Sequence, residues 1–279
     1  MEPGDADVLV FMAPDDTEGL SRALAEAPNA KWVQLPWAGI EAFVAAGVLD
    51  PARIWTCGKG VYAEPVAEHA LALALAGLRD LPQRIRATTW EEQGGVSLYD
   101  GKATILGGGA ITECLMQLLA PMRTEVTVVR RDVSAALPGA ARVVGPDALY
   151  DALADADVVF LALALTPETR GVIDEDALRA MRPHAWLVNV ARGAHVVTDD
   201  LVTALTEGWI GGAGLDVTDP EPLPDGHPLW SLPNCIITPH TANSLAMGLP
   251  LLAKRVTENL RRYADGLPLV GLVDLDAGY

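Results

Sequence analysis

Short apolar runs alternate with amphipathic stretches along most of this chain. The runs are four to six residues long, and the stretches between them place apolar side chains at helical spacing. We expect strands at residues 7–12, 31–35, 54–57, 103–106, 125–129, 158–163, 186–190, 212–217 and 235–238. We expect helices at residues 17–27, 64–78, 110–120, 174–181, 199–207 and 249–266. This alternation predicts an α/β fold in which helices cover both faces of a parallel sheet.

A glycine-rich turn stands between the expected strand at residues 103–106 and the helix after it. Gly107 and Gly109 match the first two positions of the dinucleotide-binding fingerprint G-x-G-x-x-G. In that motif the turn and the first helical residues, here Ala110 and Ile111, point backbone N–H groups at a diphosphate. The segment predicts a dinucleotide-binding βαβ unit; an ordinary glycine-rich βα turn is the alternative for this motif alone.

Two residues depart from the fingerprint. Thr112 occupies the position of the third glycine, which normally lets the helix and the strand pack closely. Its hydroxyl is able to donate to a phosphate, whereas its branched Cβ is expected to push the helix outward. Glu113 adds a negative charge beside the expected diphosphate. Both departures bear on the affinity for a dinucleotide.

Composition narrows the classes of partner. The chain has 279 residues, 50% of them hydrophobic, so it can bury a large core and we expect two domains. Its formal net charge of −17 argues against binding to nucleic acid or to an anionic membrane surface. Cys57, Cys114 and Cys235 share no metal-like spacing, so we expect reduced thiols and no metal site. Because nothing resembles a signal peptide or a membrane span, we expect a cytoplasmic location.

Three polar residues lie at the ends of expected strands and are candidates for chemistry. Arg192 follows residues 186–190, where a guanidinium can bind a carboxylate through two hydrogen bonds. Glu221 lies in a proline-rich segment, and His240 follows residues 235–238. A carboxylate bonded to an imidazole stabilises the imidazolium, which can donate a proton to a carbonyl oxygen. For each residue alone, a surface ion pair or a loop hydrogen bond is the alternative. We expect no chemistry from the remaining histidines, His69, His184, His195 and His227.

The charges after residues 125–129 bear on the choice of cofactor. An acidic residue at this point would bind the ribose 2′-hydroxyl of NAD, whereas an arginine accommodates the 2′-phosphate of NADP. Arg130 and Arg131 occupy it in a chain that is otherwise acidic. We therefore expect NADP to be preferred over NAD; two solvated loop charges are the alternative.

Several motifs occur in an order that one enzyme family shares. The longer ones are Gly107-Gly108-Gly109, Asn189-Val190-Ala191-Arg192-Gly193, Leu215-Asp216-Val217 with Glu221-Pro222-Leu223, and Thr238-Pro239-His240. The shorter ones are Ala38-Gly39-Ile40, Ala67-Glu68-His69, Leu165-Thr166-Pro167-Glu168-Thr169 and Glu258-Asn259-Leu260. In these motifs, which span nearly the whole chain, it resembles the D-isomer-specific 2-hydroxyacid dehydrogenases, and within them the glyoxylate/hydroxypyruvate reductase-like branch.

The resemblance implies two domains with a cleft between them. A Rossmann-type, doubly wound cofactor domain at residues 98–246 would be inserted into a smaller, flavodoxin-like α/β substrate domain made of residues 1–97 and 247–279. The amino-terminal region matches the family only from a later strand, so we expect the substrate domain to lack its first βα unit and to expose a sheet edge. A homodimer is also implied.

The resemblance further implies roles for individual residues. Arg192 would orient a 2-oxo acid, His240 would exchange a proton with it, and Glu221 would hold His240 in its tautomer. Two loops would bind the substrate together with Arg192, through Trp37, Ala38, Gly39, Lys59, Gly60 and Val61. The cofactor would contact Gly107, Gly109, Ala110, Ile111, Arg130, Arg131, Leu163, Thr166, Val190, Ala191, Asp216 and His240, with Asp216 on the nicotinamide amide.

The leading hypothesis is an NAD(P)H-dependent reductase of a small 2-oxo acid. Trp37 would either narrow the pocket for glyoxylate or hydroxypyruvate or stack on an aryl-pyruvate. A second hypothesis is a dinucleotide-sensing binding protein, because C-terminal-binding corepressors share this fold and a similar triad. An inactive homologue is a third, suggested by Thr112 and opposed by the intact set of Arg192, Glu221 and His240. Formate dehydrogenases fit less well, because their pattern replaces the glutamate.

Overall fold

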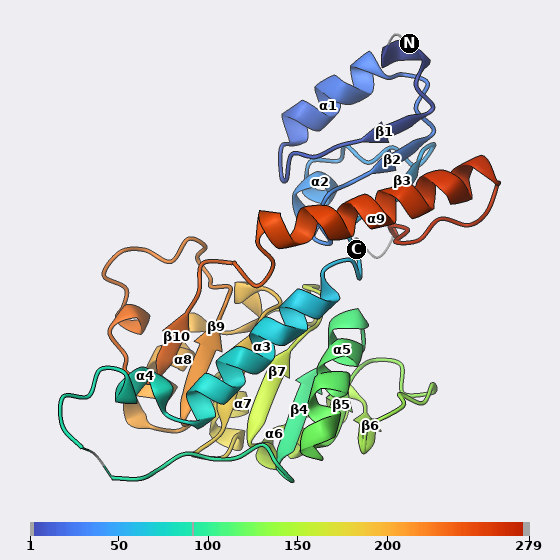
Figure 1. Ribbon diagram of the computed structural model, residues 1–279. Coiled ribbons are helices and arrows are strands. Elements are labelled where there is room, and N and C mark those ends of the chain that lie inside the picture. Colours follow the sequence, from blue (N-terminus) through green and yellow to red (C-terminus); the bar gives the residue numbers. More distant parts are fainter. Residues whose placement is uncertain (1–2, 91, 276–279) are drawn as a thin grey trace. The chain divides into compact units, whose positions relative to one another are not determined.

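The chain forms two compact units, each with its own sheet and core. The structure is a computed structural model that describes residues 3–90 and 92–275 (Figure 1). A smaller unit consists of Met1–Tyr62 and Ser244–Tyr279, and a larger unit consists of Ala63–Asn243. The sequence assigned residues 63–97 to the substrate domain. By packing, α3 (Ala63–Leu78) belongs to the larger unit, because it contacts helix α5 and strands β8 and β9 there.

Three parallel strands form the sheet in the described part of the smaller unit. They are β1 (Val8–Val10), β2 (Trp32–Gln34) and β3 (Ile54–Thr56), paired in that order. The helices are α1 (Thr17–Glu26), α2 (Glu41–Ala45) and α9 (Leu245–Ala264), with the 3-10 turn η1 (Pro3–Asp5). The side of β3 away from β2 is lined by the carboxyl-terminal tail, where Val273 N–H donates to Trp55 O at 3.0 Å. Within the described ranges, β1 pairs with β2 alone and is the other edge of this sheet.

Buried polar side chains join α9 to this sheet and to the tail. Asn259 on α9 is 0% exposed, and its side chain both donates to Val270 O and accepts from Val270 N–H, at 2.9 Å each. Its Nδ2 also lies 3.4 Å from Oε1 of the buried Gln34 on β2. Leaving these groups unpaired in the core would cost free energy. Asn259 therefore fixes the position of α9 within the smaller unit. The helix begins at Leu245, four residues before the expected start, and Ser244 caps it by accepting from Met247 N–H.

The described part of the larger unit contains one parallel sheet of seven strands, in the order β10-β9-β8-β7-β4-β5-β6. The strands are β4 (Lys102–Leu106), β5 (Glu125–Val129), β6 (Arg142–Val144), β7 (Val158–Leu161), β8 (Trp186–Asn189), β9 (Gly212–Leu215) and β10 (Cys235–Ile237). The remaining helices are α4 (Leu81–Arg84), α5 (Ala110–Leu119), α6 (Leu149–Ala154), α7 (Glu175–Ala180) and α8 (Thr198–Glu207), with the 3-10 turns η2 (Ala120–Met122), η3 (Pro146–Ala148), η4 (Gly193–His195) and η5 (Pro228–Trp230). The sequence missed β6, α2, α4 and α6, which are all short.

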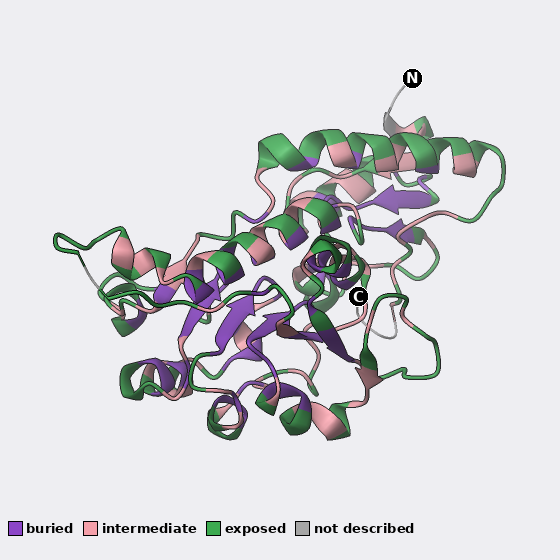
Figure 2. Cartoon of the chain, turned by 60° about the horizontal axis from the view of Figure 1, so that its bottom comes forward, coloured by how far each residue is buried: buried purple, intermediate pink, exposed green. Residues whose placement is uncertain are grey.

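Helices cover both faces of this sheet, as the sequence predicted. One core lies between the sheet and helices α3 and α5, and the other lies between the sheet and α6, α7 and α8. Figure 2 shows most of the strand residues buried and the outer faces of the helices exposed, whereas the edge strand β6 is exposed or half-buried along its length. This is the doubly wound, Rossmann-type α/β architecture expected from the alternating pattern. None of the helices in the described ranges is long and apolar enough to cross a membrane.

The strand order decides where a ligand can bind. From β4 the chain adds β5 and β6 on one side of the sheet. It then returns to add β7, β8, β9 and β10 on the other side, so the direction in which strands are added reverses between β4 and β7. In open α/β sheets, ligands bind outside the carboxyl ends of the strands at such a switch point. The strands are all parallel, so the loops after β4, β5, β7, β8, β9 and β10 leave from the same edge.

Candidate active site

Arg192 lies in a turn at the carboxyl end of β8, and side chains bind the main chain of this turn. Asn189 is 0% exposed, and its Nδ2 donates to Arg192 O at 2.8 Å. Its Oδ1 accepts from Ala191 N–H at 3.0 Å. The Arg192 guanidinium donates from Nη1 to Ala191 O at 2.7 Å and is partly buried. The geometry therefore places an oriented cation at the edge of the sheet where ligands bind.

The structure brings Glu221 and His240 together although nineteen residues separate them in the chain. His240 Nδ1 lies 2.6 Å from Glu221 Oε1. A carboxylate only accepts hydrogen bonds, so Nδ1 carries a proton and Nε2 is the nitrogen that can take up or release one. The side chains of His240 and Glu221 are 54% and 40% exposed, so the pair is open to a ligand. The arrangement can hold a proton at Nε2 and donate it.

The backbone of His240 adopts a left-handed conformation that Asp216 supports. The φ angle of His240 is +51°, a region that costs free energy for a residue other than glycine. The N–H of His240 donates to Asp216 O at 2.8 Å. The buried Asp216 carboxylate accepts from Thr241 N–H at 2.9 Å, from Ala242 N–H at 3.0 Å and from Thr238 Oγ1 at 2.6 Å. Asp216 thus holds the chain on both sides of His240.

His69 on α3 completes this network. Its Nε2 lies 2.9 Å from Thr238 Oγ1. Because Thr238 gives its single hydroxyl proton to Asp216, it accepts the bond from His69. Burial alone would raise the pKa of Asp216, but bonds from His69, Thr238 and the main chain outweigh it, so the pKa lies below its ordinary value. In the structure, three of the acceptor positions of Asp216 are used to hold the His240 turn. The expected contact of Asp216 with the nicotinamide amide stays a prediction.

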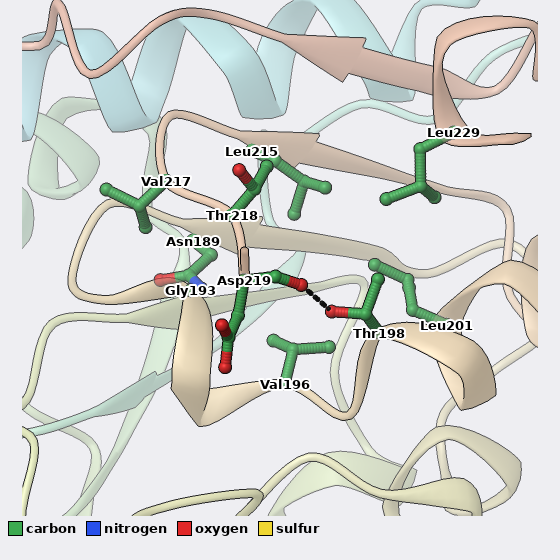
Figure 3. A pocket seen from close by; sticks show the side chains of 10 residues that line it. All are labelled: Asn189, Gly193, Val196, Thr198, Leu201, Leu215, Val217, Thr218, Asp219 and Leu229. Atoms are coloured by element: carbon green, nitrogen blue, oxygen red, sulfur yellow. Dashed lines mark hydrogen bonds between the residues drawn. The ribbon is translucent and has the colours of Figure 1, made fainter. Parts of the chain in front are cut away.

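The turn that carries Arg192 and the segment that carries Glu221 pack main chain against main chain. A Cβ on Gly193 would lie 2.0 Å from both the carbonyl carbon and the oxygen of Thr218, so only glycine fits here. Thr198 Oγ1 donates to Asp219 O at 2.6 Å, the bond drawn in Figure 3. Behind this contact lies a cavity of about 10 Å³, which holds one water at most. Displacing either segment would therefore displace the other.

The glycine turn after β4 can accept an anion. Gly107 has a φ of +113°, and a Cβ on it would lie 2.2 Å from Ala162 O. Gly109 is the N-cap of α5, and within the described residues no side chain caps this helix end. The N–H groups at the start of α5, at Ala110 and Ile111, therefore suit the diphosphate of a dinucleotide. Among the residues described, no group of three or more His, Cys, Asp and Glu side chains could hold a metal ion.

Thr112 does not act as the sequence suggested. Its side chain is 0% exposed, and Oγ1 donates to Gly107 O at 3.0 Å. The hydroxyl is thus bound within the turn rather than directed at a phosphate. Leu115 and Leu119 on the same helix are 0% exposed, so α5 has a buried face with Thr112 at this position. Glu113 is exposed in the first turn of α5.

Arg130 and Arg131 follow β5, next to the glycine turn. The Arg130 side chain crosses Gly108, where a Cβ would lie 2.6 Å from Arg130 Cδ. One terminal nitrogen of Arg130 donates to Ala135 O. Its Nε is buried and has no hydrogen-bond partner among the residues that the structure describes. Since a buried donor is rarely left unpaired, Nε marks a place for an acceptor beside the turn. Arg131 is exposed.

The other residues expected at the cofactor lie after β7 and β8. Leu163 and Thr166 are in the loop after β7, where Thr166 N–H donates to Thr169 Oγ1 at 2.8 Å. Val190 and Ala191 follow β8 and are buried beside the Arg192 turn. These residues are thus at the same edge as Gly107 and Asp216.

The two loops expected to bind substrate lie in the smaller unit and are joined there. Gly58 N–H donates to Trp37 O at 2.9 Å, and Tyr62 Oη donates to Pro36 O at 2.5 Å. Burial raises the pKa of Tyr62 to about 12, so the phenol keeps the proton that it donates. The Trp37 and Tyr62 rings are 5.1 Å apart and tilted. Ala38, Lys59 and Gly60 are exposed, and Gly39 and Val61 are partly buried. Their role in binding substrate stays a prediction.

Three residues that shape this site were not expected to do so from the sequence. Asn189 holds the turn of Arg192, and Thr238 and His69 support the turn of His240, in each case through hydrogen bonds. The available signal was their place within motifs of the family resemblance. His184, by contrast, binds Asp157 Oδ1 at 2.8 Å near the amino end of the sheet.

A family model and a known relative each match more than half of this chain. Residues 69–242 match the family model described as D-isomer specific 2-hydroxyacid dehydrogenase, NAD binding domain. The glyoxylate/hydroxypyruvate reductase A of Photorhabdus laumondii is 30% identical over 269 residues, which cover 92% of this chain and 84% of that protein.

Two solved structures of this fold match nearly the full length of the chain. A D-isomer specific 2-hydroxyacid dehydrogenase from Xanthobacter autotrophicus Py2, in complex with NADPH and MES, is 31% identical with a TM-score of 0.86, and the match covers 100% of this chain and 87% of that one. The NADPH-dependent glyoxylate/hydroxypyruvate reductase of Sinorhizobium meliloti, in complex with NADP and sulfate, is 25% identical with a TM-score of 0.84, covering 99% and 87%.

Proposed function

This chain belongs to the D-isomer-specific 2-hydroxyacid dehydrogenase family, and on that basis we propose that it reduces a small 2-oxo acid to the D-2-hydroxy acid with NADPH. The observation that carries the proposal is the 2.6 Å bond between His240 and Glu221, at the same sheet edge as Arg192. An acid–base pair next to an oriented guanidinium suits a substrate that carries both a reducible carbonyl and a carboxylate.

Each of the three residues has a separate task in this reaction. Arg192 binds the substrate carboxylate, since its planar fork matches two carboxylate oxygens. His240 donates the proton on Nε2 to the carbonyl oxygen as that oxygen becomes a hydroxyl. Glu221 accepts from Nδ1 throughout, which keeps Nε2 directed outward and stabilises the imidazolium before the proton leaves. A bound reduced nicotinamide supplies the hydride that the carbonyl carbon receives.

The site fits a phosphorylated dinucleotide through the glycine turn and the arginines beside it. The uncapped start of α5 and the close approach at Gly107 suit the diphosphate. Arg130 Nε is a buried donor with no partner in the described ranges, and Arg131 adds a second cation. These features support a preference for NADPH. So do the two solved relatives, whose complexes contain NADPH or NADP.

Replacing Arg130 and Arg131 with glutamine should weaken NADPH binding far more than NADH binding. The loss should be about tenfold or more for NADPH, because a charge-assisted bond to a phosphate contributes about 1.5–3 kcal/mol. Dissociation constants measured by nicotinamide fluorescence for both cofactors test this. Arg142→Gln, on the neighbouring strand β6, is the matched control and should leave both constants unchanged. An equal increase in the dissociation constants of NADPH and NADH would refute the assignment of Arg130 and Arg131 to the 2′-phosphate.

The proposed enzyme is a cytoplasmic homodimer. Several exposed apolar side chains lie in and after α4, among them Ile85 at 79% and Trp90 at 99% exposed. Large apolar side chains at such exposure are typical of a surface that a partner covers. Light scattering after gel filtration should give twice the mass of one chain, and a monomer mass at micromolar concentration would reject the dimer.

The experiment that tests the function follows nicotinamide absorbance with purified protein. Hydroxypyruvate, glyoxylate and phenylpyruvate are each offered with NADPH and with NADH. Oxidation of NADPH by one of these acids is the expected result, with the corresponding 2-hydroxy acid as product. This product is the D isomer for hydroxypyruvate and phenylpyruvate, whereas glycolate from glyoxylate has no stereocentre. Binding of NADPH without turnover of any acid would replace the proposal with that of a dinucleotide-binding protein. Failure to bind either cofactor would reject both.

A further inference from the structure

His195 is a buried residue that the proposed reaction does not use. All five histidines lie in the described part of the chain, and only His195 is 0% exposed. It is the last residue of the 3-10 turn η4, whose N-cap is Arg192. Burial, together with the charges of Arg192 and Arg170, lowers the pKa of His195 against the raising effect of its backbone bonds. The imidazole ring of His195 is therefore neutral at neutral pH.

Hydrogen bonds determine which nitrogen of His195 carries the proton. Arg192 N–H donates to Nδ1 at 3.2 Å, and Nε2 lies 3.3 Å from Ala164 O in the loop after β7. With the proton on Nε2, both bonds are made. With the proton on Nδ1, the ring could only donate to Arg192 O at 3.0 Å, leaving Arg192 N–H without this acceptor and Ala164 O without this donor. Because unpaired buried groups are costly, the Nε2–H form is favoured.

Two fully buried side chains thus hold the peptide groups of Arg192. His195 accepts from its N–H, and Asn189 donates to its carbonyl at 2.8 Å. The His195 bond repeats the arrangement of a capping box, in which the third residue of a turn reaches back to the N-cap N–H. Here the second ring nitrogen also reaches the neighbouring loop.

We propose that His195 is a positioning residue that fixes the main chain of Arg192 so that its guanidinium meets the substrate carboxylate. The inference rests on the proposed function, because it assigns His195 to the carboxylate-binding half of that site. The loop after β7 depends on His195 much less. Ala164 O also accepts from Thr169 Oγ1 at 2.8 Å, and this bond survives the loss of the ring. Loss of His195 therefore weakens the binding of the 2-oxo acid and spares the cofactor.

The variants His195→Leu and His195→Gln separate positioning from packing. Leucine keeps most of the apolar volume and leaves Arg192 N–H unpaired, whereas the amide oxygen of glutamine can accept from it. His227→Leu is the matched control. His227 Nδ1 accepts from Leu229 N–H at 3.3 Å in another 3-10 turn of the larger unit, η5.

For His195→Leu we expect KM for the 2-oxo acid to rise by about tenfold or more, because a small misplacement of a binding group has effects of this size. The kcat should fall less, and the Kd of NADPH should not change. His195→Gln should recover most of the loss, and His227→Leu should leave KM as in the wild type. A wild-type KM in His195→Leu, or an equal rise in both leucine variants, would overturn the proposal.

A second measurement keeps the test independent of turnover and of the folding of the leucine variant. In wild-type protein labelled with ¹⁵N at histidine, with His195→Gln used to assign the signal, Nδ1 of His195 should be unprotonated and Nε2 protonated. The opposite pattern would refute the geometry. If no 2-oxo acid is turned over, the proposed function fails, but the role of His195 can still be tested.

Oxalate binding to the NADPH-loaded protein, measured by calorimetry, provides this test. Equal binding in His195→Gln, His195→Leu and the wild type would contradict a positioning role of His195.

Discussion

Replacing His240 with alanine is expected to lower kcat for reduction of the 2-oxo acid by about 10²- to 10⁴-fold, the usual contribution of a positioned general acid. In the structure, the ring is fixed by the 2.6 Å bond to Glu221 and by the Asp216 network behind its backbone. With the ring removed, the oxygen of the substrate must take its proton from water. The Kd of NADPH, measured by fluorescence titration, should change little.

Two further variants show whether the loss belongs to this imidazole. Glu221→Gln keeps a side chain of the same size but removes the charge that stabilises the imidazolium, so kcat should fall, though less than in His240→Ala. His227→Ala removes a histidine from the same unit, in the turn before η5, and should keep the wild-type kcat. A wild-type kcat in His240→Ala would disprove its role as the acid.

The second large effect is expected from Gly193→Ala, which adds one methyl group. That carbon would lie 2.0 Å from the carbonyl carbon and oxygen of Thr218 and 2.5 Å from Asp219 N. All three are main-chain atoms, so the methyl group can be accommodated only if one of the two segments moves. Because one segment carries Arg192 and the other leads to Glu221, kcat/KM should fall by about 100-fold. The free energy of unfolding should fall by about 1–3 kcal/mol, as for other overpacked sites.

Gly4→Ala is the control for this prediction, since its Cβ would meet only Glu26 O at 3.9 Å, an ordinary contact. It should leave kcat/KM and the melting temperature unchanged. If Gly193→Ala does not fold, Thr198→Val tests the same coupling more gently by removing the 2.6 Å bond to Asp219 O. Unchanged kcat/KM in both Gly193→Ala and Thr198→Val would show that the two segments do not depend on each other.

Much of the site was predictable because its signals are local. Gly107 and Gly109 follow a strand-like run, and Arg192 and His240 each follow another, so their places at strand ends could be inferred from the order of residues alone. Glycine is suited to this turn because of the backbone conformation there, which neighbouring residues largely determine. The bond between Glu221 and His240 was expected from the family resemblance, and the structure brings the two side chains together.

The side chains that hold the site were not predictable in this way. Thr112 suggested a phosphate ligand or an obstruction, yet its hydroxyl is bound to Gly107 O, a partner that only the fold of the turn selects. No role was expected for His69 or His195, because their partners are distant in the chain. His69 binds Thr238, which lies 169 residues away, and His195 binds Ala164, which lies 31 residues away.

The α/β class, the dehydrogenase family and the glycine turn suited to a dinucleotide could all be inferred from the amino-acid sequence, because periodicity and short motifs depend on neighbours in the chain. The support that Asp216 gives to the His240 turn and the close contact of Gly193 with Thr218 became visible in the folded chain alone. The burial of His195 between two loops became visible there as well. Such contacts arise where the loops after parallel strands meet at one edge of a sheet, and no local pattern specifies which side chains will face each other there.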